Sequence, residues 1–296
     1  MNIFEIYKIA LDLLKNKTET MMLIEKVFGL NRIDISLNPY LKVDENKKNI
    51  FLGCLHRIKN GEPIQYVLGK TSFLDIDLKV GPGVFIPRPE TELLVEYIFN
   101  NFKKDFSGNV IDLCSGSGAI AICIKNYFKN SKVWAIEKSS KAFNYLVENA
   151  KVNNVKIKYI FGDIFDEFSK FEDNKFDIIV SNPPYIKTDD IEKLDKNVKF
   201  EPYMALDGGK DGLDFYRNIL KFWLPKLKKN GIMIFELGIN QHEKVKKILQ
   251  NYKFYNIKIL KDFSNIERIA IIGIAKKSKC FLQRYRIGLK SDMCKI

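Results

Sequence analysis

The strongest constraint on the fold of this chain is the alternation of short apolar runs with helical patterns after residue 108. We expect strands over residues 110–113, 133–136, 157–161, 176–180 and 232–235, and helices over 119–128, 139–153, 213–227 and 241–250. Strands that alternate with helices predict an α/β fold with a doubly wound, mostly parallel sheet. Two further strands, near 254–260 and 267–274, have no helix between them, so they predict an antiparallel hairpin at one edge of a seven-stranded sheet.

The first part of the chain has a different pattern, which predicts a small N-terminal all-α domain. Apolar residues recur at helical spacing over residues 1–60, so we assign 1–64 to this domain. Residues 66–68 and 73–80 have strand-like composition, and we interpret 65–87 as a β-hairpin linker. A helix should then begin near residue 87, with Pro89 in its first turn. The main domain would span 88–275, and 276–296 would form a basic tail.

Charge and cysteine content restrict the classes of function. The net charge is +13, but residues 276–296 alone hold seven basic residues against one acid, so direct nucleic-acid binding is open but less favoured. The five cysteines never occur as C-x-x-C, and only two histidines could join them, so we expect no metal site. No apolar run is as long as a membrane span and the first residues lack a secretory signal, so we expect a cytoplasmic protein with no membrane partner.

A glycine-rich turn follows the first strand of the predicted sheet. This glycine loop comprises Cys114, Ser115, Gly116, Ser117 and Gly118. Its glycines would let the backbone approach a ligand at the N-terminus of the next helix. The second strand ends at Glu137, which could accept hydrogen bonds from ribose hydroxyls. The third ends at Asp163, which could accept from an adenine amino group while Ile164 packs on the ring.

These residues indicate a nucleoside-containing cofactor without identifying it. The spacing Gly116-x-Gly118-x-x-Ala121 also satisfies the dinucleotide fingerprint, so an NAD-linked dehydrogenase is an alternative. A tight turn with no ligand is a second alternative, which two acids at consecutive strand ends make less favoured.

The fourth strand ends in the NPPY loop, which comprises Asn182, Pro183, Pro184 and Tyr185. Prolines have no N–H, so the backbone at 183 and 184 offers only carbonyl acceptors, and Asn182 adds a side-chain carbonyl. Two convergent acceptors would hold an NH₂ group, and the ring of Tyr185 could lie against a planar substrate group. We therefore predict all four residues as the substrate site, with Asn182, Pro183 and Tyr185 as catalytic residues.

The chemistry expected of the NPPY loop is positioning. Holding both N–H bonds would align a weakly nucleophilic nitrogen with an electrophilic methyl group, without a titratable base. Asn182 would then also contact the cofactor. A strand stop with an asparagine cap is the structural alternative, and a dehydrogenase has no use for paired acceptors here.

With these motifs the chain resembles the bacterial release factor glutamine methyltransferases of the PrmC/HemK family. The resemblance rests on the two loops and on the segments 62–66, 87–92, 201–206 and 208–213, and it covers residues 62–275. It implies a class I methyltransferase (Rossmann-like) fold with S-adenosylmethionine as methyl donor and S-adenosylhomocysteine as product. The acceptor it implies is the side-chain amide nitrogen (N5) of the glutamine in the Gly-Gly-Gln motif of peptide chain release factors, held with the help of the N-terminal domain.

The resemblance also assigns positions and shows departures. It places the glycine loop, Glu137 and Ile164 at the cofactor, and the NPPY loop at the glutamine. Arg88 and Glu90 would frame the mouth of the pocket or form a structural ion pair. Cys114 and Asn265 stand where the family commonly has glycine, and Glu137 stands where it has aspartate. A left-handed backbone at Asn265 would compensate for the missing glycine.

Three other activities stay open at this point. A ribosomal-protein glutamine methyltransferase and a nucleic-acid adenine methyltransferase share the NPPY motif. A non-catalytic nucleotide- or RNA-binding protein could use the same fold, although binding alone would not require the NPPY loop.

Overall fold

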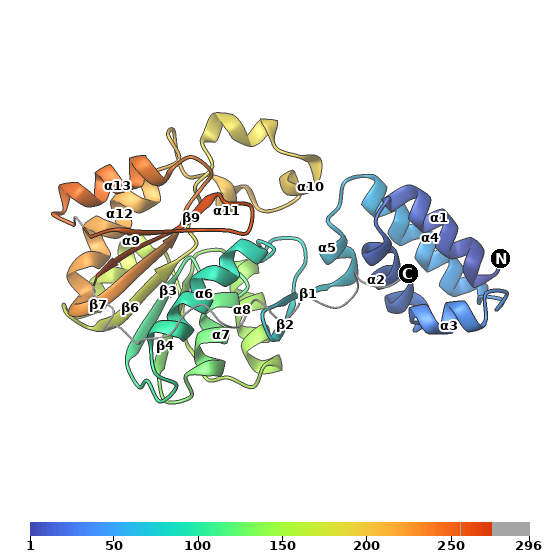
Figure 1. Cartoon of the computed structure of the whole chain (residues 1–296), viewed down its shortest axis with the longest axis horizontal. Helices are drawn as coiled ribbons and strands as arrows, with labels where there is room; N and C mark the ends of the chain where they lie inside the picture. Colours follow the sequence, from blue (N-terminus) through green and yellow to red (C-terminus); the bar gives the residue numbers. More distant parts are fainter. Residues whose placement is uncertain (255, 274–296) are drawn as a thin grey trace, which may run out of the picture.

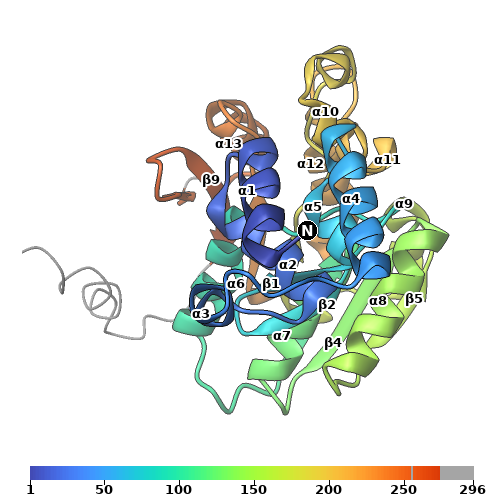
Figure 2. The same cartoon turned by 90° about the vertical axis from the view of Figure 1, so that its right-hand side faces the viewer.

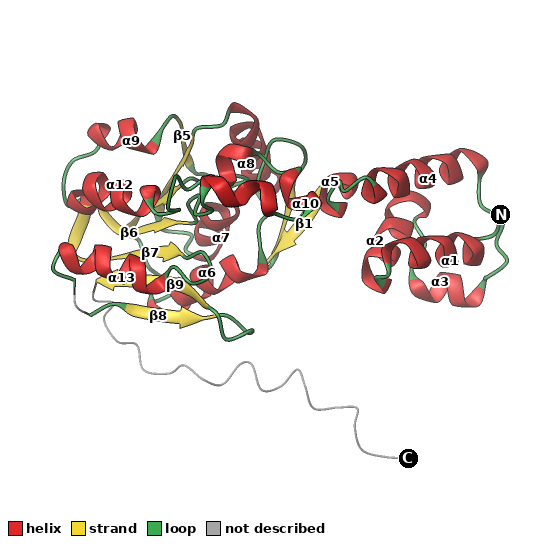
Figure 3. Cartoon of the chain, turned by 90° about the horizontal axis from the view of Figure 1, so that it is seen from above, coloured by secondary structure: helices red, strands yellow, loops and turns green. Residues whose placement is uncertain are grey.

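A helical unit lies beside a domain built on a seven-stranded sheet (Figure 1), in a computed structural model that describes residues 1–254 and 256–273. The predicted tail at 276–296 and the end of the predicted domain at 274–275 lie outside the described residues. The helices of the unit are α1 (Ile3–Leu14), α2 (Lys17–Phe28), α3 (Arg32–Leu37), α4 (Glu45–Lys59) and α5 (Ile64–Leu68). Figure 3 shows that α5 and the following strand are its link to the sheet domain.

The helical unit has a core of its own. Its first four helices begin at side chains that accept hydrogen bonds from first-turn N–H groups, as Asn2 does for Glu5 and Asp44 for Lys47. Ile6, Leu23 and Phe51, from three different helices, are fully buried together. A small N-terminal all-α unit is therefore present as predicted.

The structure corrects one predicted strand. Residues 66–68 form most of helix α5 rather than a strand. Pro63 precedes the helix with φ −56°, and Gly69 ends it in the left-handed region with φ 74°. Ile64 and Leu68 join the core of the helical unit, so this unit continues to the end of α5. The error arose because a short, fully buried apolar run has no periodicity that separates helix from strand.

A two-stranded hairpin follows, and its buried residues Phe73, Ile76 and Leu78 belong to a core of the sheet domain. Its strands are β1 (Lys70–Phe73) and β2 (Ile76–Lys79), which pair antiparallel. Helix α6 (Pro89–Asn101) begins with Pro89 at its first position. It supports the hairpin turn, because the carboxylate of Glu92 accepts a hydrogen bond from the N–H of Leu74 at 2.9 Å.

The main sheet has the predicted seven strands and an antiparallel edge. They are β3 (Asn109–Leu113), β4 (Lys132–Glu137), β5 (Lys158–Phe161), β6 (Phe176–Ser181), β7 (Leu227–Glu236), β8 (Lys258–Lys261) and β9 (Glu267–Gly273). Their order is β5-β4-β3-β6-β7-β9-β8. The first five are mutually parallel, whereas β9 is antiparallel to β7 and to β8. The strand order reverses between β3 and β6, which is where such sheets bind ligands.

Both faces of the sheet are covered, so its strands carry nearly continuous apolar runs. On β3, Val110 enters one core and Ile111 the other. One core lies under α6, α7 (Ala119–Tyr127) and α8 (Ser140–Val152). The other lies under α9 (Ile164–Glu167), α12 (Asp214–Trp223) and α13 (His242–Asn251). The layers are therefore helix, sheet and helix. The helical unit lies to one side of them in Figure 1 and in front of them in Figure 2.

A segment between β6 and α12 was not predicted as structured. This β6–α12 insert, residues 187–212, contains η2 (Thr188–Lys193), α10 (Lys196–Lys199) and α11 (Tyr203–Leu206). Its helices are too short to show a periodic pattern. The insert contacts the helical unit, because the side chain of Lys196 on α10 passes over Gly61 between α4 and α5. A Cβ added at Gly61 would lie 2.8 Å from the side chain of Lys196. Within the described residues, no helix has the length and apolar character needed to cross a membrane.

Candidate active site

The two predicted loops begin at neighbouring strand ends. β3 and β6 pair in parallel with Leu113 opposite Ser181, and each residue immediately precedes one of the loops. The hydroxyl of Ser181 donates to the carbonyl of Leu113 at 2.7 Å. The glycine loop and the NPPY loop therefore leave the same edge of the sheet side by side.

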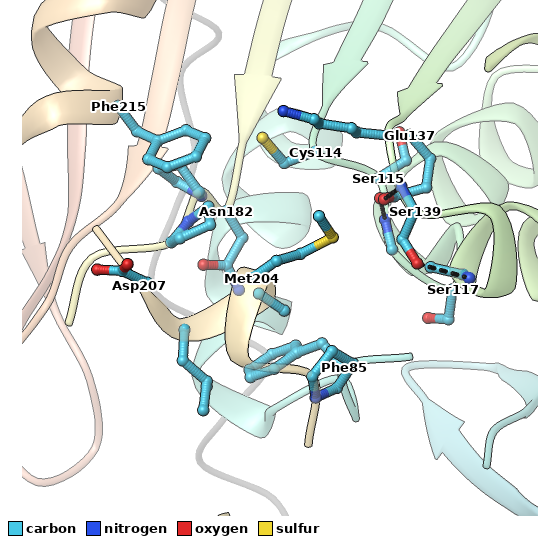
Figure 4. A pocket seen from close by; sticks show the side chains of 18 of the residues that line it. Phe85, Cys114, Ser115, Ser117, Glu137, Ser139, Asn182, Met204, Asp207 and Phe215 are labelled. Atoms are coloured by element: carbon cyan, nitrogen blue, oxygen red, sulfur yellow. Dashed lines mark hydrogen bonds between the residues drawn. The ribbon is translucent and has the colours of Figure 1, made fainter. Parts of the chain in front are cut away.

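Both loops line one cavity of about 530 Å³, a volume within the range of small-molecule sites. Eleven predicted site residues line it: Cys114, Ser115, Gly116, Ser117, Glu137, Asp163, Ile164, Asn182, Pro183, Pro184 and Tyr185. Figure 4 shows the side chains of Glu137 and Asn182 on opposite sides of this space. Gly118 is the exception, because it is absent from the lining. An added Cβ there would lie 2.5 Å from Leu146, so Gly118 allows close packing against α8.

The backbone of the glycine loop is left-handed at three positions, Cys114 (φ 62°), Gly116 (φ 56°) and Gly118 (φ 86°). Cys114 therefore adopts the conformation of the glycine that it replaces, which costs a side chain about 1–2 kcal/mol. Burial raises the pKa of its thiol well above the ordinary value, with the carboxylates of Glu137 and Asp112 adding to the rise. Cys114 is thus held as a neutral thiol in the wall of the cavity.

Glu137 organises the glycine loop from the end of β4. One carboxylate oxygen accepts from the N–H of Gly116 at 2.8 Å and the other from the N–H of Ser139 at 2.7 Å. Burial raises the pKa of Glu137, and these backbone hydrogen bonds oppose the rise. Each carboxylate oxygen has a second lone-pair direction, so Glu137 can still accept hydrogen bonds from a ligand.

Asp163 lines the cavity with its carboxylate already in use. One oxygen caps α9 by accepting from the N–H of Phe165 at 2.9 Å, and the other accepts from Lys138 at 2.6 Å. A further acceptor direction remains at each oxygen. Ile164 is buried in the wall beside it. The contacts of Asp163 and Ile164 with an adenine ring stay predictions.

The NPPY loop is fixed from behind by several side chains. The side-chain NH₂ of Asn182 donates to the hydroxyl of Thr91 at 3.1 Å. The hydroxyl of Tyr185 donates to the carboxylate of Glu236 at 3.3 Å. The backbone carbonyl of Tyr185 accepts from the side-chain NH₂ of Gln241 at 2.7 Å. Burial raises the pKa of Tyr185, helped by the charge of Glu236, so its phenol stays protonated. The backbone here also passes so close to Gly208 that a Cβ would lie 2.7 Å from the Cα of Tyr185.

Arg88 and Glu90 do not form the ion pair that the sequence suggested. Arg88 instead forms a salt bridge with Glu201 of the β6–α12 insert, whose other oxygen accepts from the N–H of Ile86 at 2.9 Å. Arg88 lines the cavity, which fits the predicted position at its mouth. Glu90 lines only a neighbouring cavity, which Arg88 and Tyr185 also border.

Sequence reasoning missed several residues that line the cavity. The most prominent are Phe85, Thr91, Ser139, Met204 and Phe215. Met204 points into the cavity from α11 (Figure 4). Thr91 lies in the segment 87–92 that carried part of the resemblance, so its position was available as a signal. Met204 lies within the segment 201–206 that also carried part of the resemblance, but it is not one of the matching residues of that segment, which are Glu201, Pro202, Ala205 and Leu206.

Two family models match the chain. The model described as the methyltransferase small domain matches residues 76–198, and the one described as the PrmC N-terminal domain matches residues 12–69. The first segment runs from β2 into the β6–α12 insert, and the second falls in the helical unit.

Curated relatives match over most of their length. The release factor glutamine methyltransferase of Thermodesulfovibrio yellowstonii is 36% identical over 266 residues, covering 88% of this chain and 94% of that protein. The protein of the same name from Clostridium botulinum is 37% identical over 254 residues, covering 85% and 89%. Among solved structures, a methyltransferase from Pyrococcus furiosus has a TM-score of 0.51 at 19% identity, covering 78% of this chain and all of that one, and it supports the fold alone.

Proposed function

Because this chain belongs to the release factor glutamine methyltransferase family, we propose that it methylates the side-chain amide nitrogen of a glutamine in peptide chain release factors. The glutamine would be that of the Gly-Gly-Gln motif, and the methyl donor S-adenosylmethionine. One observation carries the proposal: the glycine loop and the NPPY loop line a single cavity from adjacent strand ends. Such an enzyme would act in the cytoplasm, where release factors function.

The residues present fit the proposed cofactor. Gly116 faces open space, since an added Cβ would meet no atom within 4 Å, so a ligand can approach the backbone there. The carboxylate of Glu137 can accept from ribose hydroxyls, and Ile164 offers an apolar wall for the adenine. We also propose a contact between Asp163 and the adenine amino group, made alongside its bonds within the protein. When bound, S-adenosylmethionine would supply an electrophilic methyl group.

The NPPY loop would hold the glutamine amide. The side-chain oxygen of Asn182 and the carbonyl of Pro183 would accept its two N–H hydrogens, with Pro184 fixing the loop and Tyr185 lying against the amide plane. Accepting both hydrogens would align the nitrogen lone pair with the methyl group. This positioning of the amide would supply most of the acceleration of methyl transfer. Tyr185 stays protonated because of its raised pKa, so the proton lost from the product nitrogen would pass to water.

The helical unit supplies a second surface for the substrate in this proposal. We assign the part of the chain up to α5 to release factor recognition, the hairpin to a linker and the following residues to methyl transfer. This division is supported by the separate core of the helical unit, which shares no member with the two cores of the sheet domain.

A labelling experiment tests the function. The protein would be incubated with S-adenosylmethionine labelled in its methyl group and, separately, with a release factor, with ribosomal proteins and with duplex DNA. We expect label on the release factor alone, and none on a release factor whose Gly-Gly-Gln glutamine is replaced by alanine. Label only on DNA or only on a ribosomal protein would refute the proposal and support the corresponding alternative.

A further inference from the structure

A chain of hydrogen bonds runs from the NPPY loop, at the wall of the cavity, to a buried carboxylate in the sheet. Glu236, the last residue of β7, is 1% exposed, and one of its carboxylate oxygens accepts from the hydroxyl of Thr91 on α6. Thr91 in turn accepts from the side-chain NH₂ of Asn182 at 3.1 Å. The other oxygen of Glu236 accepts from the hydroxyl of Tyr185 at 3.3 Å. A single carboxylate is therefore connected to both polar side chains of the NPPY loop.

The direction of these hydrogen bonds has a chemical cause. An ionised carboxylate can only accept, so Thr91 must give its single hydroxyl hydrogen to Glu236. The hydroxyl oxygen can then only accept from Asn182. This forces the NH₂ end of the Asn182 amide toward Thr91 and leaves its carbonyl oxygen for the cavity. Without this constraint the two ends of the amide have nearly the same shape and could exchange by rotation.

We propose that Glu236 is a positioning residue that, through the hydroxyl of Thr91, makes the carbonyl end of Asn182 face the substrate. This inference rests on the proposed function, because only an NH₂ substrate needs an acceptor at that place. The same carboxylate holds the Tyr185 hydroxyl, so it fixes the ring and the amide together. Glu236 itself lines the neighbouring cavity rather than the one that holds the two loops.

The charges around Glu236 make this arrangement sensitive to pH. Burial raises the pKa of its carboxyl to about 7, the hydrogen bonds from Thr91 and Tyr185 and the charge of Arg268 on β9 oppose the rise, and Glu90 on α6 adds to it. A protonated Glu236 could donate to Thr91, and the Thr91 hydrogen could then turn to the oxygen of Asn182. The amide would present the wrong end to the cavity.

One further titratable group faces Glu236. The hydroxyl of Tyr216 on α12 donates to the backbone carbonyl of Glu236 at 2.9 Å, and burial raises the pKa of Tyr216 well above its ordinary value. Tyr216 therefore stays protonated and does not contribute a titration near neutral pH.

Variants at Thr91 and Glu236 test the inference by steady-state kinetics with a release factor. Thr91→Val keeps the shape but removes the hydroxyl, and we expect kcat to fall about tenfold or more while the Kd for S-adenosylhomocysteine stays within about twofold. Thr91→Ser should restore most of the rate, because it restores the hydroxyl. Ser131→Ala is the control, since Ser131 is a buried hydroxyl of the sheet domain that donates to the carbonyl of Phe128 at 2.7 Å and does not line the cavity, and kcat should not change.

The pH profile separates orientation from a merely structural role. The kcat of the wild-type protein should fall as pH drops below about 7, and Glu236→Gln should have a low kcat without this acidic limb. An unchanged kcat in Thr91→Val, or a Thr91→Ser variant as slow as Thr91→Val, would overturn the inference. A wild-type protein that does not label the release factor would instead overturn the proposed function.

Discussion

Asn182 offers the most direct test of how single residues act in this site. Its side chain lines the cavity and bonds to Thr91 behind it. We expect Asn182→Ala to lower kcat roughly 10²–10³-fold, the effect of removing one well-placed polar group from a site of this type. Calorimetric titration with S-adenosylhomocysteine should still show binding, because the glycine loop is untouched. A variant that retains near-normal turnover would contradict the acceptor role.

Asp112 is a buried carboxyl on the central strand, and its ionisation should affect stability. Its side chain is fully buried and accepts from the N–H of Ala121 at 3.2 Å. Burial raises its pKa to about 8 from an ordinary 3.8. Since the folded protein holds the proton more tightly than the unfolded chain, this stabilising contribution is complete below about pH 4 and is lost as pH rises through about 8.

The variant Asp112→Asn measures this effect. The amide of the variant keeps an acceptor for the N–H of Ala121 and cannot ionise. The free energy of unfolding of the wild type should therefore fall relative to that of the variant as pH rises from 6 to 9. Urea unfolding of both proteins at several pH values is the measurement. Parallel curves would show that Asp112 does not titrate as its burial implies.

Residue by residue, the sequence predicted the cavity lining well where a motif had chemical content. Eleven of its twelve distinct site residues line one cavity, and Asn265, predicted to replace a glycine, adopts φ 63°. Gly118, which was also assigned to the cofactor, does not line the cavity, and its lack of a side chain allows close packing against α8. Thr91 lies in the segment 87–92 that carried part of the resemblance, but its hydrogen bonds with Glu236 and Asn182 could not be found from sequence, because they form between side chains from three separate elements.

At the scale of elements, one side chain of α8 supports two neighbouring segments, the hairpin and the glycine loop. Asn149 is fully buried, its oxygen accepts from the N–H of Lys79 on β2 at 2.7 Å, and its NH₂ donates to the carbonyls of Lys79 and Ser117 at 3.0 and 2.9 Å. It thereby satisfies the edge of the hairpin and the glycine loop at once. Loss of its side chain would leave these backbone groups buried without partners.

We expect Asn149→Ala to lower the free energy of unfolding by about 2–4 kcal/mol and to weaken cofactor binding. Asn153→Ala is the control at the C-cap of the same helix, because the side chain of Asn153 makes an exposed hydrogen bond to the carbonyl of Asp77 and a half-buried one to the carbonyl of Asn149. That change should cost less than about 1 kcal/mol. Chemical unfolding and titration with S-adenosylhomocysteine report the two effects. Equal losses in both variants would refute the special role of Asn149.

At this scale, sequence prediction succeeded for elements with a repeating pattern and failed for those without one. The sheet strands and their flanking helices were found because burial on both faces produces apolar runs between amphipathic segments. The start of the predicted linker was misassigned, because residues 65–68 belong to α5, which has only five residues. The β6–α12 insert was missed because its folding depends on contacts such as Glu201 with Arg88, which are distant in sequence.

At the scale of the whole molecule, the described residues form one large core in the helical unit and two in the sheet domain, and the independence of the two parts can be tested. Phe51 is fully buried in the helical unit, where it packs on Phe28 with ring centroids 5.3 Å apart. Phe51→Ala should destabilise that unit by about 3–5 kcal/mol. We expect a higher KM for the release factor and an unchanged Kd for S-adenosylhomocysteine. Ile50→Ala is the control, since Ile50 is 60% exposed.

A loss of cofactor affinity in Phe51→Ala would show that the helical unit and the sheet domain do not fold as separate units. Such coupling has a structural route, because Tyr66 of α5 packs in a small cluster with Val84 and Ala142 of the sheet domain. That cluster is the physical connection through which damage in one unit could reach the other.

The pairing of Leu113 with Ser181 places the start of both loops at one point of the central sheet. Two molecules that meet freely in water lose translational and rotational entropy in the encounter, and a well-oriented site can reach effective molarities of about 10⁵–10⁸ M. Here the distance between the two binding loops is set when the strands pair, before either ligand arrives. Bending between the helical unit and the sheet domain would leave that distance unchanged, so a substrate as large and mobile as a release factor could move during the reaction without separating the reacting atoms.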